Sequence, residues 1–146
     1  MKSYLCILAV SLFAFALAAR AADDLKAMSG SWKLTKAELA GRQMPPAVLN
    51  SISFKLDGGN YAVVVQTEKG PSPDKGTVTV DATAKPKAMT VTGVEGPNAG
   101  KSFPAIYEFT GDTMRICYDL SGAARPTEFK STPGTMLYLV DYERVK

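Results

Sequence analysis

The sequence predicts an all-β domain, a small antiparallel up-and-down barrel of about eight strands that follows a cleaved N-terminal signal peptide. Gly, Pro, Asn or Asp interrupts the chain roughly every ten residues after Leu25, and the runs between them are rich in Val, Ile, Thr, Tyr and Phe. This spacing is typical of antiparallel β domains. Apolar side chains alternate within the runs, which gives each strand one apolar face. Closing the sheet into a ring hides these faces and removes exposed edges.

The chain begins with a predicted signal peptide over residues 1–21. Lys2 provides a positive start, residues 5–17 form an uncharged apolar run, and Ala19-Arg20-Ala21 has the small-x-small pattern that precedes a cleavage site. The run is shorter than the roughly 20 residues that span a bilayer. We therefore expect export to the periplasm or outside the cell with no membrane span after cleavage, and a retained anchor is the alternative. Residues 22–29 form a short lead, and 30–146 form the barrel domain.

Eight strands are expected in order along the barrel domain, with boundaries placed where turn residues interrupt the apolar runs. A helical turn is expected at residues 45–50, because proline is tolerated at the start of a helix. The longest irregular segment is residues 121–134. The expected strands cover 31–40, 51–56, 60–68, 75–81, 87–94, 102–110, 113–119 and 135–144.

Composition argues against several classes of function. Cleavage removes two basic residues, which leaves 15 Lys and Arg against 14 Asp and Glu, scattered along the chain, so a nucleic-acid partner is not expected. The chain has no histidine, and Cys117 is the one cysteine after residue 21. The usual Ser-His-Asp, Cys-His and zinc sites are therefore excluded. We expect no catalytic residue, metal ion or cofactor, with a carboxylate enzyme as a minor alternative. Cys117 is expected to be a packed thiol, with a reactive thiol or an intermolecular disulfide as alternatives.

The segment GPNAGKS at residues 96–102 is close to a phosphate-binding loop. Three residues separate Gly96 from Gly100, whereas the phosphate-binding loop requires four before its Gly-Lys pair. A strand-like run follows in place of the required helix. The segment is therefore expected to be a hairpin loop.

The first expected strand carries the one tryptophan of the chain. Gly30-Ser31-Trp32 resembles the Gly-x-Trp element of lipocalin-like (calycin) barrels, and this resemblance implies that the indole plugs the closed end. It also implies that a basic side chain from the last strand lies across the ring. Arg144 is in a suitable position, and such a cation–π contact contributes about 0.5–2 kcal/mol.

The resemblance extends over residues 30–144. GSWKL, AKPKAMTVT (84–92), EGPNAGKS (95–102), IYEFTGDTMRICY (106–118) and RPTEFKSTPG (125–134) are similar to a family of small exported proteins, expanded in planctomycete-type bacteria, whose lipocalin-like domain is uncharacterised. The resemblance implies a small barrel and supplies no activity. The chain departs from true lipocalins because it lacks a disulfide pair.

The leading hypothesis is non-catalytic binding of a small apolar or amphipathic ligand inside the barrel. Aromatic rings on the inward faces could provide contact area, and tyrosine hydroxyls could orient the ligand. The alternative is that the same rings fill the core. The candidate ligand contacts are Phe54, Tyr61, Tyr107, Phe109, Tyr118 and Tyr138.

The second hypothesis is a protein-interaction or structural module of the cell envelope, with a filled barrel and working loops. Its candidate surface contains Arg125, Glu128 and Phe129, and the protein partner is unknown. Alternatively, Phe129 folds back onto the barrel while the two charged residues are paired or solvated. A continuous cavity of several hundred Å³ would favour ligand binding, because such volumes are usual for ligand sites.

Overall fold

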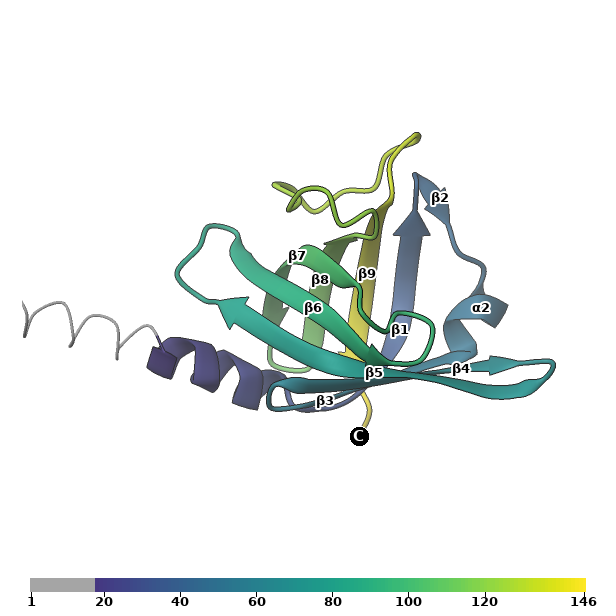
Figure 1. Cartoon of the computed structure of the whole chain (residues 1–146), viewed down its shortest axis with the longest axis horizontal. Helices are drawn as coiled ribbons and strands as arrows, with labels where there is room; N and C mark the ends of the chain where they lie inside the picture. The colour runs from purple at the N-terminus through teal and green to yellow at the C-terminus, as the bar shows by residue number, and fades with distance from the viewer. Residues whose placement is uncertain (1–17) are drawn as a thin grey trace, which may run out of the picture.

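The computed structural model describes residues 18–146, so residues 1–17 of the predicted signal peptide lie outside the described residues. A helix over 18–28 leads into a β-barrel (Figure 1). The elements that follow the helix are β1 (Gly30–Leu39), β2 (Arg42–Gln43), α2 (Pro46–Asn50), β3 (Ile52–Asp57), β4 (Asn60–Thr67), β5 (Gly70–Asp81), β6 (Lys87–Glu95), β7 (Ser102–Thr110), β8 (Thr113–Asp119) and β9 (Leu137–Arg144).

The eight long strands form a closed antiparallel ring. Strands β3 to β8 each pair with the next strand along the chain, β1 pairs with β3, and β1 also pairs with β9 to close the barrel. The two-residue β2 folds back on the end of β1 outside the ring. The predicted up-and-down barrel of about eight strands is therefore confirmed, and so is the short helix that follows Pro45.

Strand β5 begins at Gly70, whereas the sequence analysis expected a start at residue 75. Pro71 and Pro73 lie in this stretch, and proline is more typical of turns than of strands. It pairs with β4 from Gly70 onward, but it pairs with β6 only from Lys75. Proline lacks a backbone N–H and is tolerated where a strand has a free side. The first residues of β5 therefore pair with a neighbouring strand on one side only.

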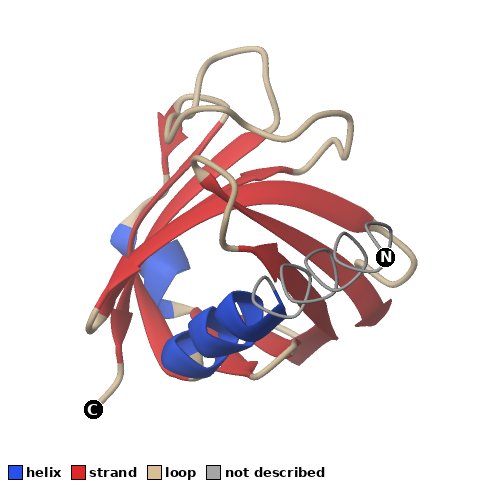
Figure 2. Cartoon of the chain, turned by 90° about the vertical axis from the view of Figure 1, so that its left-hand side faces the viewer, coloured by secondary structure: helices blue, strands red, loops and turns tan. Residues whose placement is uncertain are grey.

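A helix over residues 18–28 crosses one end of the barrel (Figure 2). Met28 is fully buried, and its carbonyl accepts a hydrogen bond of 2.9 Å from Trp32 Nε1. Asp24 accepts a hydrogen bond of 2.6 Å from the Tyr107 hydroxyl and pairs with Lys87 Nζ at 2.9 Å. The predicted short lead over 22–29 is thus largely helical and packs on the barrel. No helix within residues 18–146 is long and apolar enough to cross a membrane.

The loop between β8 and β9 packs against the outer face of the barrel. It covers Ile106 and Cys117, which are paired across β7 and β8 and are almost fully buried. The Cys117 thiol points to the carbonyl of Lys130 at 3.5 Å, and burial raises its pKa. At the start of the loop, the Asp119 carboxylate accepts hydrogen bonds from Ser121, whose hydroxyl lies 2.6 Å away, and these bonds lower the pKa of Asp119. Ile106 and Cys117 thus form a second, smaller apolar layer beneath the loop, and this layer explains why a long loop is held in one conformation.

Candidate functional site

The base of the barrel is closed around Gly30, Trp32 and Arg144. Trp32 is 1% exposed, and the Arg144 guanidinium lies 4.4 Å from the centre of its ring. The same guanidinium donates hydrogen bonds to the carbonyls of Ser29 (2.6 Å) and Ala27 (2.8 Å). Gly30 has a φ of +137°, and a Cβ at this position would lie 2.7 Å from Arg144 Nη1. The Gly-x-Trp element therefore has a direct physical reason: the glycine leaves space for the cation that covers the indole.

A cavity of about 780 Å³ occupies the rest of the barrel. It extends from Phe54, which pairs with Trp32 on the neighbouring strand, to loop residues at the end of the barrel opposite the helix. Aliphatic and aromatic side chains together form most of its wall, and polar residues lie at its mouth. The lining consists of Leu34, Ile52, Phe54, Tyr61, Val63, Val65, Asp74, Val78, Met89, Val91, Asn98, Lys101, Ser102, Phe103, Tyr118, Leu120, Ser121, Gly122, Tyr138 and Tyr142.

The cavity brings together four of the six predicted ligand contacts, namely Phe54, Tyr61, Tyr118 and Tyr138. The other two predictions need correction, because Tyr107 and Phe109 lie outside this lining. Tyr107 is 1% exposed and its hydroxyl is bound to Asp24 of the N-terminal helix, while Phe109 stacks on Tyr107 with ring centres 6.5 Å apart. β7 runs toward the closed end, so its last inward residues pack beneath the helix and not beside the cavity.

Tyr142 belongs to the cavity wall, although the sequence analysis did not select it. It shares a face with Tyr138 because the two are four residues apart on β9, and this parity is the signal that could have found it. Its ring lies 5.0 Å from that of Phe54 and its hydroxyl lies 2.9 Å from that of Tyr118. The Tyr118 and Tyr138 rings stack with centres 5.7 Å apart. β8 and β9 thus present three tyrosines side by side.

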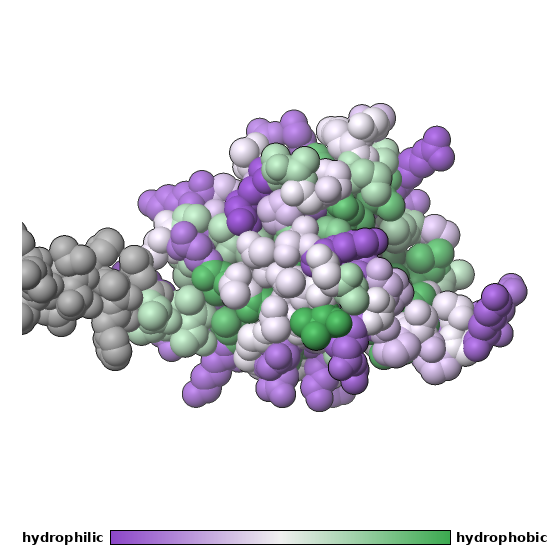
Figure 3. Space-filling model, in the orientation of Figure 1, coloured by the Kyte–Doolittle hydropathy of each residue, from purple (hydrophilic) through white to green (hydrophobic). Residues whose placement is uncertain are grey.

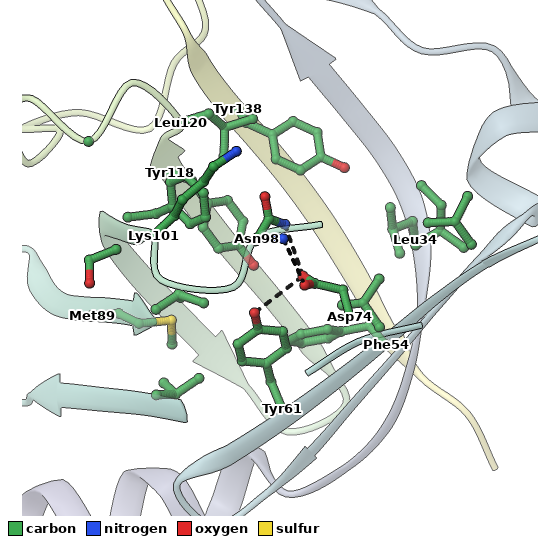
Figure 4. Close-up of a pocket in the computed structure, with 18 of the residues that line it drawn as sticks. Leu34, Phe54, Tyr61, Asp74, Met89, Asn98, Lys101, Tyr118, Leu120 and Tyr138 are labelled. Atoms are coloured by element: carbon green, nitrogen blue, oxygen red, sulfur yellow. Dashed lines mark hydrogen bonds between the residues drawn. The ribbon is translucent and has the colours of Figure 1, made fainter. Parts of the chain in front are cut away.

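Asp74 and Asn98 form a polar cluster on the opposite wall, shown in Figure 4. The Asn98 side-chain amide donates to Asp74 Oδ2 at 2.9 Å, and the Tyr61 hydroxyl donates to the same oxygen at 3.2 Å. Burial and the adjacent Asp74 carboxylate raise the pKa of Tyr61 to about 12. Sequence analysis left Asp74 outside the strand expected at 75–81, so it missed this cluster.

The loop over residues 96–101 folds back against β5 and β6 at the mouth of the cavity. Asn98 ties it to Asp74, and the loop passes so close to Gly93 that a Cβ there would lie 2.0 Å from the Asn98 carbonyl oxygen. Lys101 of this loop contributes to the lining. The GPNAGK segment is a connection between two antiparallel strands, β6 and β7, and no helix follows it.

The predicted loop surface lies away from the cavity. Arg125 donates hydrogen bonds to the backbone carbonyls of Met89 and Ala105, so it fastens the loop to β6 and β7. Glu128 pairs with Lys130 at 2.7 Å, and Phe129 is half-buried. These contacts fit the alternative in which the charged residues are paired and the phenylalanine folds back onto the protein.

Stability is expected to fall as the pH rises above about 10, where phenols ionise in an unfolded chain. Burial raises the pKa of Tyr118 and of Tyr142 and keeps both neutral in the folded protein. The folded state then binds more protons than the unfolded state, so each phenol lowers the free energy of unfolding by up to about 1.4 kcal/mol per pH unit. Urea unfolding at about pH 8 and pH 11 measures this loss, and Tyr118→Phe should reduce it. Equal stability at the two pH values would contradict the expectation.

Comparison with solved structures finds a similar fold. A lipocalin-like protein from Bacteroides uniformis superposes with a TM-score of 0.50 at 11% identity, covering 82% of this chain and 99% of that one. An uncharacterized protein from Bacteroides eggerthii gives a TM-score of 0.46 at 12% identity, covering 80% and 98%. No protein-family model matches the chain, and no curated protein matches it. The fold is therefore lipocalin-like, whereas membership of the planctomycete-type family stays a prediction.

Proposed function

We propose that this protein binds a small apolar or amphipathic molecule inside the barrel without transforming it. The observation that carries the proposal is the cavity of about 780 Å³ with a mostly apolar wall of aliphatic and aromatic side chains. Ligand sites usually occupy about 300–1,000 Å³ and combine an apolar lining with a few polar groups. Val63, Val65 and Val91 point inward but are only half-buried, so the interior is accessible and not filled by side chains.

The outer surface supports the choice of the cavity over an interaction surface. On the face shown in Figure 3, polar and charged residues surround small, separate apolar groups. The large apolar side chains that are exposed within residues 18–146 are Val48 in α2, Val94 in β6, Met136 just before β9 and Val145 just after β9. Interaction sites are more often marked by a contiguous apolar patch. The alternative of an envelope interaction module has less support, because Arg125 is already engaged by the barrel backbone.

The proposal includes export and the absence of catalysis. Export is supported by the apolar run over residues 5–17 and the small-x-small pattern that ends at Ala21. Absence of catalysis is supported by the lack of histidine in the sequence and by the polar cluster of the cavity, in which Tyr61, Asp74 and Asn98 bind one another. We also propose membership of the planctomycete-type family, on the segments that carry the resemblance.

The test is to block the cavity with one large side chain. In Val63→Trp, the indole points into the cavity, and the affinity for an uncharged apolar dye such as Nile red should fall by about tenfold or more because the ring takes the ligand's space. Val64→Trp is the matched control, because its side chain lies on the opposite face of the same strand. Dye titration followed by fluorescence measures both variants, and mass spectrometry of protein purified from cells searches for a retained molecule.

Equal loss of affinity in the two variants, or no binding by the unaltered protein and no retained molecule, would refute ligand binding in the barrel. Circular dichroism confirms that each variant keeps its β structure, so that a loss of binding is not mistaken for unfolding.

A further inference from the structure

We infer that the ligand of this cavity is an apolar molecule with one neutral hydrogen-bond acceptor of the carbonyl class, held by the hydroxyls of Tyr118, Tyr138 and Tyr142. The inference rests on the proposed function and specifies its ligand. It follows from two phenol protons on one wall of the cavity for which residues 18–146 provide no acceptor.

The first free donor belongs to the Tyr118–Tyr142 pair. Their hydroxyl oxygens lie 2.9 Å apart and both residues are buried in the cavity wall. One hydroxyl proton forms the bond between them, and among residues 18–146 no acceptor takes the other proton. A buried donor without an acceptor is costly, so an oxygen acceptor on a ligand would stabilise this pair.

The second free donor is Tyr138. Its ring stacks on Tyr118 with centres 5.7 Å apart and extends from β9 into the cavity (Figure 4). Its hydroxyl forms no hydrogen bond with any residue between 18 and 146, although the residue lines the cavity. Tyr118 and Tyr138 are also direct register partners on β8 and β9. Two unused phenol protons therefore lie on the same wall.

The opposite wall does not offer the same chemistry. The Tyr61 hydroxyl donates to Asp74, and the Asp74 carboxylate also accepts the Asn98 amide. The Tyr61 hydroxyl proton and one Asn98 amide proton are therefore already accepted by Asp74. A phenol oxygen can also accept a hydrogen bond, but a ligand that offers only donors leaves both phenol protons of the tyrosine wall without a partner, whereas a ligand acceptor satisfies them.

The acceptor is expected to be neutral. The same burial that raises the pKa of Tyr118 and of Tyr142 would penalise a carboxylate placed beside them. The negative charge of Asp74 also lies in this lining, and Lys101, the lysine among the lining residues, is exposed at the mouth. A ketone, ester or quinone oxygen satisfies the phenols without this penalty. Aliphatic residues on the remaining walls suit an apolar body.

The experiment compares three ligands of equal chain length, 2-decanone, decane and decanoate, by displacement of Nile red from the full chain. We expect 2-decanone to bind most tightly. Tyr138→Phe should weaken 2-decanone by about three- to tenfold, as expected for one neutral hydrogen bond, and leave decane unchanged. The double variant Tyr118→Phe/Tyr142→Phe removes the free proton of the pair and should have a similar effect. Tyr107→Phe is the control, because the Tyr107 hydroxyl lies outside the cavity. This variant should not alter the ratio of the affinities for 2-decanone and decane.

Three results would overturn the inference while leaving the proposed function intact. These are decane binding as tightly as 2-decanone, decanoate binding more tightly than 2-decanone, and a ratio of 2-decanone to decane affinity that neither Tyr138→Phe nor the double variant Tyr118→Phe/Tyr142→Phe changes. Failure of Nile red and of all three ligands to bind would instead remove the proposed function, and the inference with it.

Discussion

Replacing Trp32 with alanine is expected to lower the free energy of unfolding by about 3–5 kcal/mol, the usual cost of truncating a large buried aromatic residue. Trp32 is 1% exposed and pairs in register with Phe54 on one side and with Arg144 on the other. Its indole N–H also binds the carbonyl of Met28 at the end of the N-terminal helix. One side chain thus joins both strands beside β1 and the helix that covers the base, so its removal leaves a cavity that none of these elements can fill alone.

Urea unfolding followed by circular dichroism measures the effect of Trp32→Ala, since the variant lacks the tryptophan that fluorescence would follow. Trp32→Phe is the control: it keeps an aromatic ring in the base but loses the indole N–H, so its loss of stability should be clearly smaller. Hydrogen exchange should show faster exchange of the amides in residues 18–28 in the alanine variant. A loss below about 1 kcal/mol for Trp32→Ala would mean that the base is not closed around the indole.

Arg144→Met is expected to lower the free energy of unfolding by about 2–4 kcal/mol, since it removes a cation–π contact and charged hydrogen bonds together. Met keeps much of the side-chain length but cannot donate to the carbonyls of Ala27 and Ser29. It also loses the ion pair with Asp112, whose carboxylate lies 3.2 Å from Arg144 Nε. The Ser29 carbonyl left behind is only partly accessible to water, which adds to the cost.

Arg115→Met is the matched control for Arg144→Met. Arg115 also lies in a barrel strand and binds a carboxylate, Asp141, at 2.7 Å, but its side chain is 44% exposed. Exposed ion pairs contribute about 0–1 kcal/mol, so this variant should remain close to the unaltered protein in urea unfolding. Similar losses for the two variants would show that the place of Arg144 over Trp32 has no special importance. A double variant with Trp32→Phe would measure the coupling between ring and cation directly.

The two ends of the barrel are expected to differ in what they contribute, one mainly to stability and the other mainly to ligand binding. Trp32, Arg144 and the helix over 18–28 bury polar and aromatic groups together at the base. The opposite end is formed by loops around an accessible cavity, with Asp74 and Asn98 at its edge. Variants of the base are therefore expected to change stability first, whereas variants such as Val63→Trp and Tyr138→Phe are expected to change ligand affinity first.

Much of the fold could be predicted from the sequence, because the patterns that indicate strands and turns lie within short stretches of neighbouring residues. Strands β7 and β8 were predicted with their observed bounds, since each is a short alternating run between turn residues. The start of β5 was not predicted. Whether Pro71 and Pro73 are tolerated in a strand depends on which neighbouring strand each residue pairs with. The helical character of residues 22–28 was missed for a similar reason: its contacts with Lys87 and Tyr107 come from distant parts of the chain.

The sequence by itself determined the all-β class, the ring of about eight strands and most of the inward-facing aromatic residues, because alternation with a period of two depends only on neighbouring residues. Only the tertiary structure decided which of these residues share a cavity: Tyr118, Tyr138 and Tyr142 do, whereas Tyr107 is taken by Asp24 at the base. The physical reason is that strand tilt and closure set the depth of each residue along the barrel. Depth depends on pairing across the whole ring, which no single stretch of sequence contains.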